Sequence, residues 1–136
     1  NRNIYGSWYE MSLYTKNRYN IDSEISIKYG GDKGKYYHNN FSAYGIGIEY
    51  NGRLYLGELG SLNSNISWQH NKEESDIRIL PPEALNGLTI GENINASTRV
   101  NYFFNKDMSI SFSVSFINNY RYNNLITVLG EFRAYL

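Results

Sequence analysis

The chain has 136 residues with 14 tyrosines, 12 glycines and no cysteine, which excludes a disulfide scaffold and cysteine-based metal or catalytic chemistry. Its 13 basic residues balance its 13 acidic residues, so the charge gives no signal for nucleic-acid binding. A mean hydropathy of -0.54, with no run of about 18 apolar residues, excludes a membrane protein built from helices.

Alternation of apolar and polar residues runs through the first half of the chain and predicts β-strands with one face of each kind. Residues 21–29 and 41–50 follow this pattern, and 4–15, 53–59 and 62–70 follow it more weakly. Asn51-Gly52 is the strongest short signal for a β-hairpin, so we predict a turn there. Residues 30–40, which contain three glycines, are predicted to form a long loop.

The second half continues the alternation, and its clearest strand covers residues 108–116. There five apolar residues from Met108 to Phe116 alternate strictly with four serines. Residues 125–136 are also a predicted strand, and 76–80 and 95–104 are weaker candidates. Long loops are predicted over 81–93, which begins with Pro81-Pro82, and over 118–124, with a tight turn at 105–107.

These elements predict a single all-β domain over residues 1–136, an antiparallel up-and-down β-barrel in which eight or nine strands are visible. Strands of 10–12 residues, tilted by about 40°, rise about 25–30 Å, which matches the hydrophobic band of an outer membrane. If the last strand ends in the periplasm, nine strands put the loops at 30–40, 81–93 and 118–124 outside and the short turns inside. An odd number favours a segment of a larger barrel. If 53–70 is instead one long bulged strand, the count is eight and the asymmetry of the connections is weaker.

Aromatic residues gather near the predicted strand ends, as the interfacial girdles of membrane barrels require. They are Trp8, Tyr9, Tyr14, Tyr50, Trp68, Tyr102, Phe103, Phe104, Tyr120, Tyr122 and Tyr135. Charged residues on the polar faces would point into the barrel lumen, and the candidates for lumen-facing side chains are Glu24, Lys28, Glu49, Arg99, Glu131 and Arg133.

No residue pattern predicts a catalytic, cofactor or metal site. His38 and His70 are separated in the sequence and have no clustered carboxylates, so they are expected to be solvated loop residues. A lipid A hydrolase on the barrel wall would need a serine within reach of a histidine. The sequence places no serine two positions from either histidine on a shared strand face.

The end of the chain, Val128-Leu129-Gly130-Glu131-Phe132-Arg133-Ala134-Tyr135-Leu136, resembles the terminal strand of Gram-negative outer-membrane barrels. The resemblance implies that the barrel-assembly machinery reads this strand, with Gly130, Phe132, Ala134 and Leu136 as the signal residues. The final residue is leucine rather than the commoner phenylalanine. Residues 82–136 also resemble the ends of large barrel proteins of Bacteroidota, through Asn105-Lys106 and the last six residues, which implies a location and a fold.

The sequence therefore predicts a non-enzymatic protein of the cell outer membrane with a structural, pore-forming or complex-anchoring role. Its expected partners are outer-membrane lipid and lipopolysaccharide, the barrel-assembly machinery and other envelope subunits, with no nucleic acid. The alternatives are a small outer-membrane enzyme that modifies lipid A and a soluble lipocalin-like barrel that binds a ligand.

Overall fold

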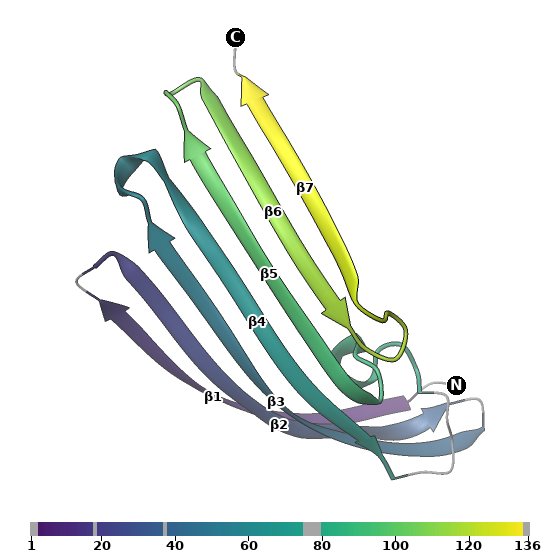
Figure 1. The fold of residues 1–136 in the computed structure, drawn as a ribbon. Helices are drawn as coiled ribbons and strands as arrows, with labels where there is room; N and C mark the ends of the chain where they lie inside the picture. The colour runs from purple at the N-terminus through teal and green to yellow at the C-terminus, as the bar shows by residue number, and fades with distance from the viewer. Residues whose placement is uncertain (1–2, 18, 37, 75–79, 135–136) are drawn as a thin grey trace.

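The computed structural model describes residues 3–17, 19–36, 38–74 and 80–134. They form one sheet of seven strands in which each strand pairs antiparallel with the next along the chain (Figure 1). The strands are β1 (Asn3–Asn17), β2 (Ile21–Tyr36), β3 (Asn39–Tyr55), β4 (Gly60–Glu73), β5 (Gly91–Phe103), β6 (Met108–Asn118) and β7 (Leu125–Ala134). The all-β, antiparallel, up-and-down prediction is confirmed.

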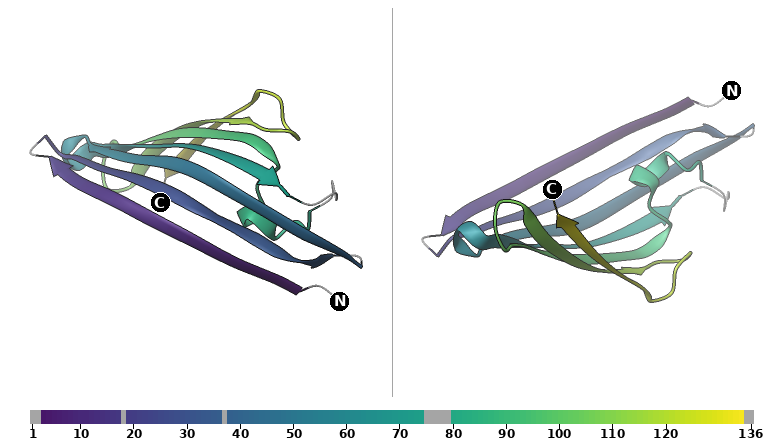
Figure 2. Two further views of the ribbon diagram at one scale, coloured as in Figure 1. Left: turned by 90° about the horizontal axis from the view of Figure 1, so that it is seen from below. Right: turned by 90° about the horizontal axis from the view of Figure 1, so that it is seen from above.

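The sheet is curved but open, since β1 and β7 lie at opposite edges and are not paired with each other (Figure 2). β1 begins at one end of the sheet and β7 ends at the other, as Figure 1 shows. Because neighbouring strands alternate in direction, β1 and β7 run the same way. The described residues therefore do not close into a barrel on their own.

The described residues form seven strands, whereas the sequence predicts eight or nine. One predicted turn is wrong, and one predicted strand lies mostly outside the described residues. The predicted turn at Asn51-Gly52 lies inside β3, where Asn51 pairs with Glu24 of β2 and Asn65 of β4. Strands on both sides continue past this point, and their ladder bonds hold it extended. The weak candidate strand at 76–80 lies, except for Leu80, outside the described residues.

The chain instead reverses after β3 through a short 3₁₀ helix, η1 (Gly57–Leu59). Gly57 there has a positive φ of 64°, which glycine adopts without steric cost. The dipeptide signal at Asn51-Gly52 is thus overridden by tertiary pairing, and the turn forms a few residues later.

The predicted long loop at 30–40 is also wrong, because β2 continues to Tyr36 and β3 resumes at Asn39. Glycines in this stretch make room for neighbours: a Cβ atom on Gly30 would lie 2.8 Å from Cδ2 of Trp8. His38 lies in the tight turn, with a φ of 72°. The glycines therefore reflect close packing of strands rather than a mobile loop.

The two ends of the sheet differ in the length of their connections. At the short-turn end lie the connections 18–20, 56–59 and 104–107, and at the long-loop end lie 37–38, 74–90 and 119–124. The predicted turn at 105–107 and loop at 118–124 are confirmed. The longest connection contains a second 3₁₀ segment, η2 (Ala84–Gly87), which contacts β2 and β3.

Candidate functional site

The two faces of the sheet differ in their main chemistry. Directly opposed residues share a face, and the register puts Met11, Ile27, Ile48 and Trp68 in one row across β1 to β4. This apolar face carries most of the exposed large hydrophobic side chains, including Met11 at 78%, Phe112 at 50% and Phe132 at 61% exposure. The opposite face carries serine, asparagine and charged residues.

The polar face is the concave one. A hollow of about 620 Å³ lies on it, with walls formed by residues from β1 through β6, and such distant strands can line one hollow only if the sheet curves towards it. We call the two sides the concave polar face and the convex apolar face. The curvature follows the right-handed twist and coiling of antiparallel sheets.

The six charged residues predicted to share a polar face do so. The register opposes Glu24 to Asn51, Lys28 to Gly47, Arg99 to Ser113, and Glu131 to Ser111. They are not gathered in one place: Lys28 and Glu49 belong to one group, Arg99, Glu131 and Arg133 belong to a second, and Glu24 lines the hollow. The six predicted residues, which share this face with other charged side chains, are Glu24, Lys28, Glu49, Arg99, Glu131 and Arg133.

The first group is centred on Glu49 in β3. Its Oε2 accepts a hydrogen bond from Lys28 Nζ at 2.9 Å, and its Oε1 accepts bonds from the side-chain amides of Asn51 at 3.1 Å and Asn65 at 2.9 Å. Glu10 Oε1 lies 4.0 Å from the same lysine nitrogen. The charges of Lys28 and Glu49 are therefore both compensated by groups on the concave polar face.

The second group lies on β5 to β7, nearer the short-turn end. Arg133 Nε donates to Glu131 Oε1 at 2.7 Å, and Arg99 Nη2 lies 3.6 Å from Glu131 Oε2. Ser111 Oγ donates to the same carboxylate at 3.5 Å. One glutamate thus holds two arginines, which leaves this part of the face with excess positive charge.

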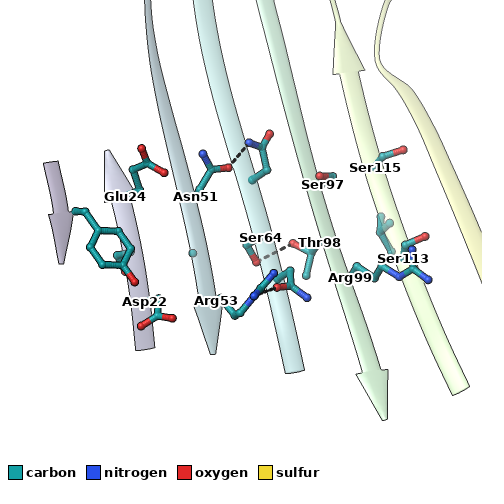
Figure 3. A pocket seen from close by; sticks show the side chains of 16 residues that line it. Asp22, Glu24, Asn51, Arg53, Ser64, Ser97, Thr98, Arg99, Ser113 and Ser115 are labelled. Carbon is teal, nitrogen blue, oxygen red and sulfur yellow. Dashed lines mark hydrogen bonds between the residues drawn. The ribbon is translucent and has the colours of Figure 1, made fainter. Parts of the chain in front are cut away.

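The hollow between the two groups is lined mainly by neutral hydrogen-bonding side chains (Figure 3). Ser97, Ser113 and Ser115 lie on one side of it, and Asp22 and Glu24 lie on the other, as Figure 3 shows. Asn65 donates to Asn51 at 2.6 Å across β3 and β4, and Arg53 donates to Asn63 at 2.6 Å. This surface can hydrogen-bond a polar solute or water along its whole width.

The sequence did not indicate that the connection between β4 and β5 folds onto the concave polar face. We call residues 80–90 the inward loop. Leu85 in it is fully buried, and Ala84 is 1% exposed. The backbone N–H of Leu85 donates to Asp32 Oδ2 of β2 at 2.6 Å, and Trp8 Nε1 donates to Asp32 Oδ1 at 3.3 Å.

Buried amides of β4 and β5 hold the other half of the inward loop. Asn71 Nδ2 donates to the carbonyl oxygen of Thr89 at 2.9 Å, and Asn93 Oδ1 accepts from the backbone N–H of Thr89 at 3.0 Å. Both asparagines are 1% exposed. Together with Phe41 and Ala43 of β3, at 3% and 2% exposure, Ala84 and Leu85 are the buried apolar residues of the described chain. The core lies here, between loop and sheet.

His70 differs from the solvated loop residue that the sequence predicts. It lies inside β4 on the convex apolar face, opposite Ile46 and Glu92. Its Nδ1 is 2.7 Å from Glu92 Oε1, and its ring stacks on Trp68 with centroids 6.5 Å apart. Trp68 Nε1 donates to the other oxygen of Glu92. No sequence spacing signals this contact, because the register of β4 and β5 creates it.

Three of the predicted girdle aromatics lie on the concave polar face, since Tyr14 is opposite Glu24, Trp8 bonds Asp32 and Phe103 is opposite Ser109. Tyr9, Trp68 and Tyr102 lie on the convex apolar face, opposite Tyr29, Ile48 and Ile110. Among the predicted signal residues, Gly130, Phe132 and Ala134 are on the convex apolar face of β7, opposite Phe112, Ile110 and Met108. Leu136 is outside the described residues.

Within the described ranges, no helix is both long and apolar enough to cross a membrane. The same part of the chain has no group of three histidine or acidic side chains placed to hold a metal ion. No protein-family model, curated protein or solved structure matches this chain.

Proposed function

We propose that this chain is a membrane-embedded wall segment of an outer-membrane β-barrel, with a structural, pore-forming or complex-anchoring role. The observation that carries the proposal is the convex apolar face, which extends over all seven strands and is exposed. Exposed apolar patches on soluble monomers rarely exceed a few hundred Å². A face of this extent is stable against lipid, with the polar side turned to water.

The boundary of the convex apolar face also supports a membrane environment. Towards the long-loop end it ends at the row of Tyr9, Tyr29, Ile46 and His70. Beyond that row the same side of β2 carries Lys33 and Lys35. Two of the four residues in that row are tyrosines, and tyrosines with charged residues beyond them are the order expected at a membrane interface.

The strand lengths also suit a bilayer. β7, the shortest strand, has 10 residues, and at about 3.3 Å per residue and a tilt of about 40° it rises about 25 Å. That height equals the apolar band of outer-membrane barrels. With the short-turn end in the periplasm, the two longest connections, 74–90 and 119–124, lie outside as is usual in these proteins, and 37–38 is the one short turn on that side.

The two free edges support a larger closed barrel. Every strand that spans a membrane must have its backbone groups paired, because lipid offers no hydrogen bonds. β1 and β7 run in the same direction, so direct pairing between them would be parallel. An antiparallel closure needs an odd number of additional strands, which gives the even total that outer-membrane barrels have.

The experiment that tests this proposal is fractionation of cells that produce the natural protein. We expect it in the outer-membrane fraction, extracted only by detergent, with different gel migration before and after heating. The protein is expected to be insoluble without lipid or detergent because its convex apolar face is exposed. Its migration is expected to change on heating because the closed sheet resists unfolding by detergent in the cold. Recovery of a folded protein from the detergent-free soluble fraction would contradict the proposal and favour the lipocalin-like alternative.

The lipid A-modifying alternative has one supporting observation, the His70–Glu92 pair on the convex apolar face. In the described part of the chain, His70 has no hydrogen bond to a serine or threonine that could act as a nucleophile. We therefore expect His70→Ala to leave lipid A unchanged. The measurement is mass spectrometry of lipid A from cells that produce the natural protein or the variant. A modification present with the natural protein and lost with His70→Ala would instead establish the enzyme.

A further inference from the structure

We propose that the inward loop is a fixed constriction that narrows the water-filled side of the barrel near its long-loop end. This inference rests on the proposed function, because it takes the concave polar face as the inner wall. A loop that stood up into solvent would leave that wall open, whereas this loop lies against β2 and β3.

The first anchor joins the tip of the loop to the wall. Leu85 donates its backbone N–H to Asp32, 53 residues earlier in the chain, and this hydrogen bond is buried. Asp32 is 8% exposed, and its second carboxylate oxygen accepts the Trp8 indole N–H. A buried carboxylate that keeps two donors gains strong, charge-assisted bonds, so the tip is held by more than packing.

The second anchor holds the end of the loop from other strands. Asn71 of β4 and Asn93 of β5 both bond the backbone of Thr89. One anchor is in β2 and the other is in β4 and β5, so movement of the tip away from the sheet would break the buried bond to Asp32. The inward loop is therefore a fixed part of the concave polar face.

The backbone of the loop tip is consistent with a fixed shape. Leu85 and Asn86 have left-handed φ angles of 54° and 57°, followed by Gly87 at 79°. Non-glycine residues keep such angles only where the surroundings over-determine them, and such strain concentrates at functional sites. Here the surroundings are the buried contacts of Ala84 and Leu85.

The narrowed passage has a defined lining. A hollow of about 480 Å³ separates Asn86 and Leu88 of the inward loop from Lys28 and Glu49 on the wall, with Trp8 beside them. Lys28 is 2.9 Å from Glu49 and 4.0 Å from Glu10, and the lining, which also includes Ser67, Gln69 and Asn95, holds one more acidic side chain than basic ones. A hydroxyl-rich solute that is neutral or cationic can exchange hydrogen bonds with these side chains, so this is the class of solute that the passage fits.

The test compares single-channel conductance of the full natural protein in planar lipid bilayers with that of a variant in which residues 82–87 are replaced by a short glycine–serine link. We expect a several-fold rise in conductance. Equal conductance of the two proteins would contradict the proposed constriction. The absence of current through both proteins would also contradict it. Failure of the natural protein to insert into membranes would instead contradict the proposed function itself.

A cysteine-labelling experiment keeps the inference testable if the loop replacement fails to fold. The chain has no cysteine, so Leu85→Cys introduces a single thiol. We expect it to be protected from a membrane-impermeant maleimide in the outer membrane and to be labelled once Asp32→Ala is added. Asp22→Ala, on the same strand and face and bonded to Tyr55, is the matched control and should leave the thiol protected. Immediate labelling without Asp32→Ala would refute the fixed loop.

Discussion

Val114→Arg is expected to destabilise the membrane-inserted protein by about 2–4 kcal/mol, the cost of a cationic side chain on the lipid side of a barrel near the bilayer midplane. Val114 lies in the middle of β6, opposite Thr98 and Val128 on the convex apolar face. The measurement is the equilibrium between urea-unfolded and vesicle-inserted protein, followed by tryptophan fluorescence and gel migration.

The matched control is Ser115→Arg, one residue further along the same strand. Ser115 lies on the concave polar face, opposite Ser97 and Thr127, where an arginine stays in water. We expect its free energy of unfolding to stay within about 0.5 kcal/mol of the natural protein, as for most surface changes. If the two variants lose the same stability, the convex face does not contact lipid.

Asn93→Leu is expected to lower the free energy of unfolding by about 1–3 kcal/mol, because it keeps the number and branching of the side-chain heavy atoms but leaves buried polar groups without partners. Asn93 accepts from both the backbone N–H and the hydroxyl of Thr89, at 3.0 Å and 2.9 Å. It also donates to the carbonyl oxygen of Thr89 at 2.7 Å. Urea titration of the inserted protein measures the loss.

The control for this prediction is Asn95→Leu, two residues further along the same face of β5. Asn95 is half-buried and lies against Ser67 and Ile117 in the register, so fewer polar groups lose a partner. We expect a clearly smaller loss of stability. An effect of Asn93→Leu no larger than that of Asn95→Leu would show that the buried amide network does not hold the inward loop.

The alternation in residues 108–116 predicted its strand well, because the period of two is a property of the backbone and does not depend on partners. For the same reason Glu24, Arg99 and Glu131 could be assigned to one face before any register was known. Which of them meet was not predictable. The contact of Glu131 with Arg99 depends on the pairing of three strands.

The features that sequence reasoning missed are all created by contacts between distant residues. Asn51-Gly52 carries a strong local turn signal, but β2 and β4 both pair across it, and the ladder bonds outweigh the local preference. The inward loop depends on Asp32, far away in the chain. A single aspartate in a glycine-rich stretch gives no sign of the loop that it will hold.

The difference in strand length has a consequence for binding at the long-loop end. β3 begins at Asn39, four residues before Ala43, which pairs with the last residue of β4, so the β2–β3 hairpin extends beyond β4 while β1 stays paired alongside it. Its backbone is ordered by ladder bonds, whereas a flexible loop would lose about 1–2 kcal/mol of conformational entropy per residue when a partner fixes it. A partner that binds this hairpin therefore meets a surface already ordered during folding, and most of the contact energy remains available for affinity.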